Sequence, residues 1–334
     1  MIFDLQDGTE WLVIYHASCR DGFCAAWLFH RAFEVNNTQA QFVSDQYAGD
    51  ERTDKYDDLK KQVKNRNVAI VDFSYSFEKT KALLEEYGAK KVVVLDHHTT
   101  AEDQVNRFID YANTPAASGS ASGVFDLNRS GAGLALDFLE FACEGEHLDL
   151  PERGPKREDW IARYVQDRDL WRFELPDSKA VNAYLSTLPL RFKPWNETQE
   201  KPLQEVVTQG EFLLSYQKEV QSANNRRSHW CEISDGKQTW SAPAVNATAL
   251  ISETLHDLGD NQPFAVGYFV SNKLDVVVSL RSPEDGEDVG VIAKAMGGGG
   301  HKHAAGFRLP LYDLGASTSG RIFRVQAKKD KPDE

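Results

Sequence analysis

Cysteine is scarce in this 334-residue chain, which has four such residues and no Cys-x-x-Cys pair. Small secreted proteins that are held together by disulfides use cysteine far more densely. The pattern fits a reducing cytosol better than a disulfide scaffold, so we expect a cytoplasmic protein. The cysteines are Cys19, Cys24, Cys143 and Cys231.

Long hydrophobic runs are also missing, because the longest apolar stretches have the length of a single strand. A helix that crosses a bilayer needs about 20 apolar residues. The N-terminal segment MIFDLQDGTEW has no basic start followed by an apolar stretch, so it does not resemble a secretory signal. We therefore expect no membrane partner.

Positive charge is in short supply, with 38 Lys and Arg residues against 51 Asp and Glu residues and a net charge of −13. Proteins that bind long nucleic acids attract the phosphates with Lys and Arg. The balance argues against a non-specific polymer binder, while short or locally held phosphate substrates stay open. A hydrophobic content of 41% suits a globular protein with a core, and the length suits about two domains.

The first half of the chain alternates strand patterns with helix patterns. Short apolar runs at 11–15, 68–74 and 91–98 predict strands, and segments such as 24–33 between them predict helices. The Gly- and Ser-rich stretch 114–123 is typical of a loop. Strands separated by helices predict an α/β domain whose parallel sheet is covered on both faces.

A second, smaller α/β unit is predicted after a long helical connector. Its strand patterns at 264–270 and 275–282 follow one another closely, which favours a mostly antiparallel sheet. The last residues are highly charged and are typical of a disordered tail. We therefore expect a first domain over 1–200, a helical linker over 201–227, a second domain over 228–314 and a disordered tail over 315–334.

Each of the three predicted strands in the first half ends in side chains that can bind metals. In a parallel α/β sheet the carboxyl ends of the strands meet at one edge, where ligands bind. One aspartate alone at such a place is more often a helix cap, but three strand ends together predict a metal site. The residues are His16, Cys19 and Asp21 after the first strand, Asp72 after the second, and Asp96, His97 and His98 after the third.

The types of ligand indicate which metal is expected. Aspartate oxygens and imidazole nitrogens with little thiolate suit Mn²⁺ or Mg²⁺ better than a structural zinc. More than four candidate ligands suggest two ions, which is a common arrangement for phosphoryl chemistry. The segment YVQDRDLWRF offers a further carboxylate, with Asp167 favoured and Asp169 as the second choice.

Four consecutive glycines precede two histidines in GGGGHKHAAGF, residues 297–307. The stretch matches neither a P-loop nor a dinucleotide fingerprint, because it follows a predicted helix and lacks the required spacing. A flexible turn is one interpretation. The other is a loop whose bare backbone lets a phosphate or a ribose come close.

Together these segments resemble a known family. HASCRDG, VDFS, LDHH and QDRDLW occur in the order found in the DHH phosphoesterase superfamily, and SLRS with GGGGHKHAAGF is similar to its DHH-associated substrate-binding domain. The resemblance covers about residues 11–310. It implies a parallel-sheet DHH domain that is joined to the smaller α/β domain by a helical linker.

The resemblance also implies roles for individual residues. A departure lies at Cys19, which stands where the family often has an aspartate, so its binding of a metal is in doubt. Asp72 would bridge two metal ions, His98 would contact the scissile phosphate or protonate the leaving oxygen, and Asp96 would orient a histidine. The implied metal ligands are His16, Asp21, Asp72, His97 and Asp167.

The second domain would hold the substrate. The implied activity is hydrolysis of short oligonucleotides or linear dinucleotides to mononucleotides, as in oligoribonucleases. A RecJ-like single-strand exonuclease and a non-catalytic nucleotide-binding protein remain alternatives, and RNA or DNA preference, cleavage polarity and a homodimer stay open. The implied substrate-binding residues are Arg281, Ser282, Gly298, Gly299, Gly300, His301 and His303.

Overall fold

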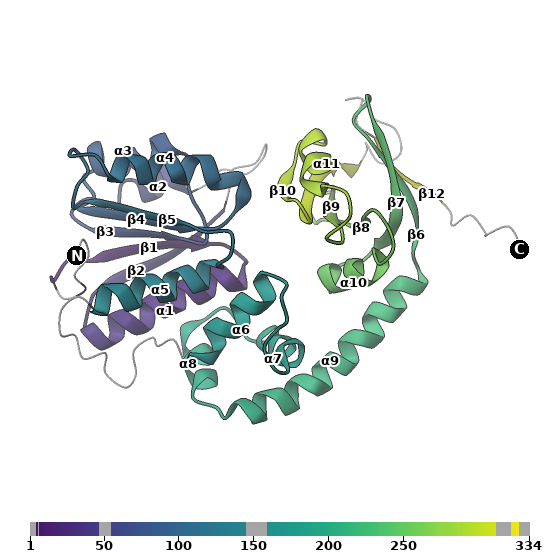
Figure 1. The fold of residues 1–334 in the computed structure, drawn as a ribbon, viewed down its shortest axis with the longest axis horizontal. Coiled ribbons are helices and arrows are strands. Elements are labelled where there is room, and N and C mark those ends of the chain that lie inside the picture. The colour runs from purple at the N-terminus through teal and green to yellow at the C-terminus, as the bar shows by residue number, and fades with distance from the viewer. Residues whose placement is uncertain (1–4, 6, 47–54, 145–158, 312–321, 327–334) are drawn as a thin grey trace, which may run out of the picture. The chain divides into compact units, whose positions relative to one another are not determined.

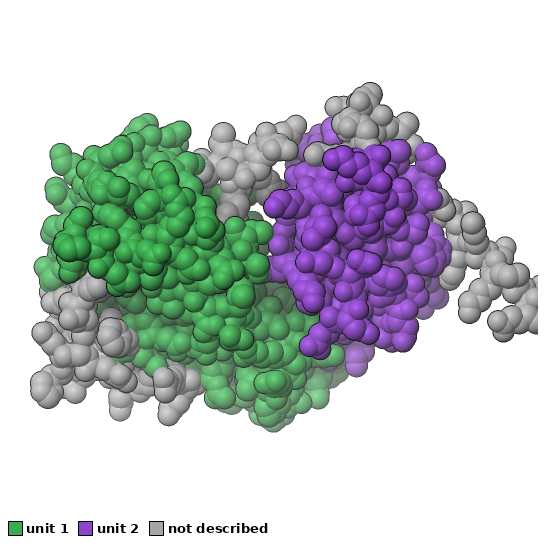
Figure 2. All heavy atoms as spheres, turned by 45° about the horizontal axis from the view of Figure 1, so that its top comes forward, with its two compact units in different colours: residues 1–213 green, residues 214–334 purple. Residues whose placement is uncertain are grey.

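The structure is a computed structural model, and it describes residues 5, 7–46, 55–144, 159–311 and 322–326. The chain divides into two compact units, which comprise residues 1–213 and 214–334 (Figure 2). The division falls within helix α9 (Leu203–Arg226), which is the connector expected from the sequence. Within the described ranges, every helix is too short or too polar to span a membrane.

The first unit is built on a five-stranded sheet in the order β2-β1-β3-β4-β5. All neighbouring pairs are parallel, as the alternating pattern predicts. Helices α1 and α5 lie on one face of this sheet, and α3 and α4 lie on the other (Figure 1). The strands are β1 (Trp11–His16), β2 (Ala40–Asp45), β3 (Asn67–Val71), β4 (Lys91–Asp96) and β5 (Ala121–Phe125).

The helices of this unit include those expected from the sequence. Figure 1 shows α6, α7 and α8 beside α1, on the side of the sheet that α1 and α5 cover. The helices are α1 (Arg20–Asn36), α2 (Tyr56–Leu59), α3 (Phe77–Glu85), the 3₁₀ turn η1 (Thr99–Ala101), α4 (Glu102–Ala112), α5 (Gly131–Glu144), α6 (Trp160–Asp169), α7 (Ser178–Leu185) and α8 (Phe192–Gln199).

Strand β3 shows why the central strands are apolar along their whole length. Its side chains point alternately to the two faces of the sheet. Ala69 and Val71 are buried in the core on the α1 side, and Val68 and Ile70 are buried in the core on the opposite side. A strand buried on both faces therefore contains no polar alternation. Polar residues begin only where the strand ends.

The second unit contains a seven-stranded sheet in the order β10-β11-β9-β8-β7-β6-β12. All neighbouring pairs are antiparallel except β7 with β8, in agreement with the mostly antiparallel prediction. The elements are β6 (His229–Ser234), β7 (Thr239–Asn246), α10 (Ile251–Leu258), β8 (Ala265–Val270), β9 (Asp275–Arg281), α11 (Val289–Ala295), β10 (Gly299–His301), β11 (Ala304–Pro310) and β12 (Ile322–Gln326).

The prediction of a disordered tail over 315–334 is wrong for its middle part. Strand β12 pairs antiparallel with β6, and Phe323 is fully buried in the core of the second unit. Burial of an aromatic side chain together with a row of main-chain hydrogen bonds outweighs the polar composition around it. Residues 315–321 and 327–334 lie outside the described residues.

Candidate metal centre

The carboxyl ends of β1, β3 and β4 meet at one edge of the first sheet, because these three strands are neighbours and run in the same direction. His16 ends β1, Asp72 follows β3, and His97 follows β4. His97 Nε2 lies 3.1 Å from Asp72 Oδ1, and His16 Nδ1 lies 3.6 Å from Asp72 Oδ2. Asp72 therefore stands between two histidines, one on each carboxylate oxygen.

Asp72 is held in an unusual state. Its φ angle of 55° lies in the left-handed region, which a residue with a side chain seldom adopts. Its side chain is completely buried, and Oδ2 has no hydrogen-bond partner among the described residues. Backbone strain and an unsatisfied buried oxygen each cost free energy, so they persist where the surroundings enforce them. Both observations fit an oxygen that binds a cation.

Asp21 reaches the same cluster from the first turn of α1. Its Oδ2 lies 3.7 Å from His97 Nε2. The carboxylate also accepts hydrogen bonds from Ser130 Oγ (2.7 Å) and from the backbone N–H groups of Gly131 and Ala132 (2.5 and 3.0 Å). These N–H groups begin α5 and have no partner within that helix. Asp21 thus joins the N-terminus of α5 to the cluster.

The structure reverses the order of preference between the two aspartates of α6. Asp169 Oδ2 lies 3.6 Å from His97 Nε2, and Asp21, His97 and Asp169 can each offer an atom to one ion. The Asp167 carboxylate instead accepts hydrogen bonds from Ser178 Oγ and from the backbone N–H groups of Glu174 and Leu175. It stabilises the turn that follows α6. The geometry therefore favours Asp169 over Asp167 as the candidate ligand, and the assignment stays a prediction.

Three groups of side chains have ligand atoms within 4.8 Å of one another in the described part of the chain. Cys19, whose binding of a metal the sequence left in doubt, lies in one of them. The groups overlap through Asp72 and His97, so the set can hold more than one ion. They are His16 with Cys19 and Asp72, Asp72 with His97 and His98, and Asp21 with His97 and Asp169.

Asp96 and His98 form a pair beside these ligands. Asp96 Oδ1 lies 2.8 Å from His98 Nδ1 and accepts hydrogen bonds from the backbone N–H groups of His97 and His98. One buried carboxylate thus fixes both the backbone turn after β4 and the orientation of the His98 ring. This is the contact expected of a carboxylate that orients a histidine.

Electrostatics in the cluster show an excess of negative charge. Burial and the neighbouring Asp169 and Asp72 raise the pKa of Asp21 well above its usual value, and burial and Asp72 raise the pKa of Asp169. Burial opposes ionisation of Asp72 as well, but its contacts with His16 and His97 outweigh burial and lower its pKa. The site therefore favours added positive charge.

The same carboxylates also change the pKa of His97. Burial disfavours its charged form, but the hydrogen bond to Asp72 and the charge of Asp21 outweigh burial and raise its pKa to about 10. In the absence of metal, a proton on His97 supplies the positive charge that the carboxylates require. A divalent cation bound at the same place would displace that proton.

Two glycines that the sequence analysis did not single out shape the cluster. A Cβ atom on Gly131 would lie 2.3 Å from Cβ of Asp72, and one on Gly22 would lie 2.8 Å from Cβ of His16. Both distances are far shorter than a van der Waals contact. Only glycine lets the N-termini of α1 and α5 come this close to the strand ends. Gly22 and Gly131 lie in the segments RDG and SGAG, but the need for glycine there is apparent only from the spatial proximity of His16 and Asp72.

In the second unit, the polar residues expected to bind substrate form local contacts at the end of β9. Arg281 donates to the carbonyl of Leu280 (2.8 Å) and to Ser252 Oγ (2.9 Å). Ser282 Oγ lies 3.0 Å from His303 Nδ1. His301 ends β10, which pairs with β11. These residues therefore gather on neighbouring strands, and their role toward a substrate stays a prediction.

The run of four glycines has structural causes at three of its positions. Gly297 follows α11 with a φ angle of 84°, which only glycine adopts freely. A Cβ atom on Gly298 would lie 2.1 Å from the carbonyl oxygen of Gly306, and one on Gly300 would lie 2.5 Å from Cα of Ala305. A Cβ atom on Gly299 would have no atom within 4 Å. Close packing against β11 thus requires Gly298 and Gly300, and the turn after α11 favours Gly297, without any ligand.

Comparisons with known proteins show what the chain is similar to. No family model matches it. An uncharacterized protein of Acanthamoeba polyphaga mimivirus is 24% identical over 306 residues, which are 88% of this chain. The chain spans 66% of the length of that relative.

The fold is shared with an exopolyphosphatase-related protein from Bacteroides fragilis, at a TM-score of 0.52 and 10% identity over 90% of this chain and 87% of that chain. RecJ from Thermus thermophilus in complex with Mn²⁺ is also similar, at a TM-score of 0.48 and 15% identity over 91% of this chain and 50% of that chain. The likeness to the Bacteroides fragilis protein shows that the chain shares the fold of that protein.

Proposed function

We propose that this chain is a metal-dependent phosphodiesterase of the DHH superfamily that hydrolyses short oligonucleotides or linear dinucleotides to mononucleotides. The observation that carries the proposal is the position of Asp72. It is buried and held in the left-handed region, and it places its two oxygens toward His97 and His16. A carboxylate that faces ligands on both sides is the arrangement that a pair of ions needs.

Two ions would be held on the two sides of Asp72. His16 lies next to Oδ2 and shares a possible site with Cys19 and Asp72, and Asp21, His97 and Asp169 form the other group. Carboxylate oxygens and imidazole nitrogens favour Mn²⁺, with Mg²⁺ as the other candidate. Such ions, when bound, polarise a phosphoryl oxygen and make water a stronger nucleophile at neutral pH.

His98 is proposed as the proton donor to the leaving oxygen. Burial disfavours its charged form, but the hydrogen bond to Asp96 outweighs burial and raises the pKa of His98 above its usual value. The raised pKa favours the protonated ring that a proton donor needs, and Asp96 keeps the ring in one orientation. His98 Nδ1 lies 4.0 Å from Asp72 Oδ1, so the donor stands next to the metal ligands.

A short substrate is favoured by charge. The net charge of −13 repels a long strand, whereas a dinucleotide presents few phosphates. A RecJ-like exonuclease is the alternative within the same chemistry, and a nucleotide-binding protein without catalysis is the alternative outside it. A location in the cytoplasm is proposed from the scarcity of cysteine.

The decisive experiment is chromatography of the products from a panel of substrates, with Mn²⁺, with Mg²⁺ and with EDTA. We expect mononucleotides from a dinucleotide at a higher rate than from a strand of about twenty nucleotides, and no product with EDTA. A faster reaction on the long strand, with affinity that falls steeply as salt rises, supports the exonuclease instead. Tight binding of a dinucleotide without product in either metal supports the non-catalytic alternative.

A further inference from the structure

The two halves of the metal centre differ in the atoms that they offer to a cation. The half around His97 offers two carboxylates and one imidazole. The other half brings the sulfur of Cys19 within 4.8 Å of a ring nitrogen of His16 and a carboxylate oxygen of Asp72. We propose that this second half binds a divalent cation of the Zn²⁺ class through the thiolate of Cys19, so that the two ions of the centre differ. The inference rests on the metal centre of the proposed function and adds the identity of one ion.

The donor set favours such an ion. Thiolate ligands select Zn²⁺ over Mn²⁺ and Mg²⁺, which prefer oxygen ligands from carboxylates and water. One thiolate, one imidazole and one carboxylate also leave the fourth position of a tetrahedral ion open, as in catalytic zinc sites. A thiol must lose its proton when it binds a metal, and Zn²⁺ removes that proton readily. A thiol therefore discriminates between these cations, whereas an aspartate at the same position would accept Mn²⁺ or Mg²⁺.

The local structure places this thiol beside the end of a strand. Cys19 is the N-cap residue of α1 and follows His16, the last residue of β1, by three positions. Ser18 between them has a φ angle of 56°, in the left-handed region, and turns the chain back toward the strand end. Cys19 is partly exposed, so an ion can reach it. By contrast, Cys24 and Cys231 are buried in the apolar cores of the two units.

The two partners of Cys19 are held in place by the protein. The ring of His16 stacks on the buried ring of Phe73, with their centroids 6.3 Å apart. Asp72 is completely buried, and its Oδ2 has no hydrogen-bond partner among the described residues. A bound cation would satisfy that oxygen. Ligands that are already ordered lose little conformational freedom on binding, so this half of the centre is prepared for an ion.

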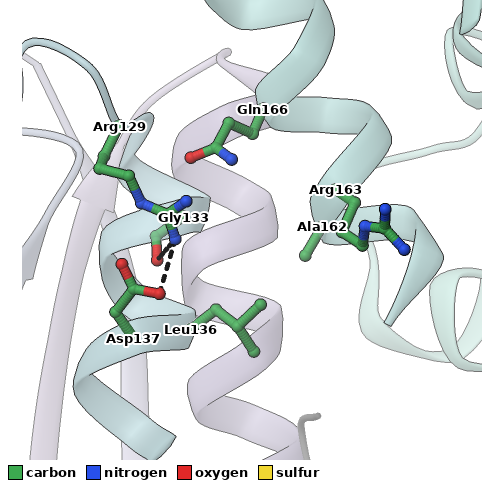
Figure 3. A pocket seen from close by; sticks show the side chains of 7 residues that line it. All are labelled: Arg129, Gly133, Leu136, Asp137, Ala162, Arg163 and Gln166. Atoms are coloured by element: carbon green, nitrogen blue, oxygen red, sulfur yellow. Dashed lines mark hydrogen bonds and ion pairs between the residues drawn. The ribbon is translucent and has the colours of Figure 1, made fainter. Parts of the chain in front are cut away.

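A carboxylate elsewhere in the first unit provides a control for the experiment. Asp137 lines a cavity of about 430 Å³ between α5 and α6. Figure 3 shows its carboxylate beside Arg129, whose Nη2 donates to Asp137 Oδ1 at 2.6 Å. This arginine already neutralises the carboxylate. Asp137→Asn therefore removes one negative charge from the unit without removing a proposed metal ligand.

The test is titration of Co²⁺, as a spectroscopic substitute for Zn²⁺, into the metal-free full-length protein in the absence of oxygen. A thiolate bound to Co²⁺ gives an intense charge-transfer absorption in the near ultraviolet, which oxygen and nitrogen ligands do not give. We expect this absorption in the wild-type protein and in Cys24→Ala, and its loss in Cys19→Ser. Absence of the absorption from the wild-type protein, or its persistence in Cys19→Ser, would overturn the proposal.

Cys19→Asp gives a second measurement, because it replaces the sulfur by an oxygen ligand. The ratio of Zn²⁺ affinity to Mn²⁺ affinity, measured by competition with a chelating dye, should fall by at least about tenfold, since even a side chain that orients a ligand is worth about 10–100-fold in metal affinity. Asp137→Asn should leave this ratio unchanged. An unchanged ratio in Cys19→Asp, or an equal fall in both variants, would contradict the role of the thiol.

These measurements distinguish the identity of the ion from the proposed function. If Co²⁺ gives no thiolate absorption but Mn²⁺ supports hydrolysis of a dinucleotide, the proposed role of Cys19 is wrong and the proposed function stands. If the absorption appears but no product forms with any of these metals, the role of Cys19 stands and the phosphodiesterase activity is wrong.

Discussion

Asp72 combines three properties that rarely occur in one residue, namely a left-handed backbone, complete burial and a carboxylate oxygen without a hydrogen-bond partner among the described residues. The Asp72 N–H still donates to the carbonyl of Leu95 in β4, but the left-handed backbone departs from the extended conformation of β3. Strain of this kind is retained when a site depends on it. Substitution of Asp72 therefore tests the proposed chemistry most directly.

Replacement of Asp72 by Asn should lower turnover of a dinucleotide by more than about a hundredfold. Loss of a side chain that merely orients a metal ligand already lowers metal affinity or activity by about 10–100-fold. The protein should remain folded, since the substitution keeps the side-chain shape; it removes repulsion with Asp21 and Asp169 together with the attraction to His16 and His97. Turnover and thermal stability are measured together. A rate near that of the wild type in saturating Mn²⁺ would contradict the bridging role.

Asp167 and Asp169 provide a matched pair of substitutions. Asp167→Ala should lower the free energy of unfolding by about 1–3 kcal/mol, because Ser178 and two backbone N–H groups lose their acceptor. Asp169→Ala should leave stability nearly unchanged and reduce bound Mn²⁺, since its contact is with His97. Denaturant titration and metal analysis distinguish the two. The reverse result would restore Asp167 as the ligand.

The titration of His97 predicts how the metal-free protein responds to pH. The pKa of His97 is about 10 in the folded chain and 6.5 without structure, so the folded state binds the proton more tightly. The resulting stabilisation is fully present below about pH 6.5 and is lost as pH rises through about 10. Melting temperatures in EDTA should therefore fall between pH 7 and pH 10, and His97→Asn should reduce this fall. An equal fall in both proteins would assign the effect to other groups.

At the scale of elements, the approach of β10 to β11 explains glycines that the sequence left open to a functional interpretation. Gly300→Ala should destabilise the protein by about 1–3 kcal/mol, because its φ angle of 140° and its contact with Ala305 both exclude a side chain. Gly299→Ala should change stability by less than about 0.5 kcal/mol, since the added methyl group meets open space. Thermal unfolding compares the two.

Gly299 is also the control for the functional interpretation of the run. If the bare backbone lets a substrate approach, Gly299→Ala should weaken dinucleotide binding while the melting temperature stays the same. If binding is unchanged as well, the glycine run serves the strand pairing alone.

At the scale of the whole molecule, the proposed ligands all lie in the first unit, and the polar residues around Arg281 and His301 lie in the second. Arg281→Ala should reduce kcat/KM on a dinucleotide by about ten- to a hundredfold, because it removes a charge-assisted phosphate contact. Bound Mn²⁺ should not change. A small phosphodiester without a second nucleotide should be hydrolysed equally by the variant and the wild type. A loss on that minimal substrate would place Arg281 in the reaction centre.

The sequence determined the main architecture because the central strands of the first unit are buried on both faces. Val68 to Val71 and Val92 to Leu95 must be apolar throughout, so they are recognisable without a structure. Edge strands carry a weaker signal. Strand β5 has partly exposed residues and small side chains, and its start lies in a Ser- and Gly-rich stretch whose composition predicts a loop. Hydrogen bonding to β4 makes it a strand.

The cluster of strand-end ligands was likewise determined by sequence, because parallel neighbouring strands bring His16, Asp72 and His97 to one edge whatever the details of packing. Only the tertiary structure shows that Asp169 lies beside His97 and that Asp167 lies beside Ser178. Two residues apart on a helix, they point in directions about 160° apart, and the rotation of α6 decides which one faces His97. That rotation depends on contacts such as Asp167 with Ser178, which are distant from the motif and cannot be derived from local sequence.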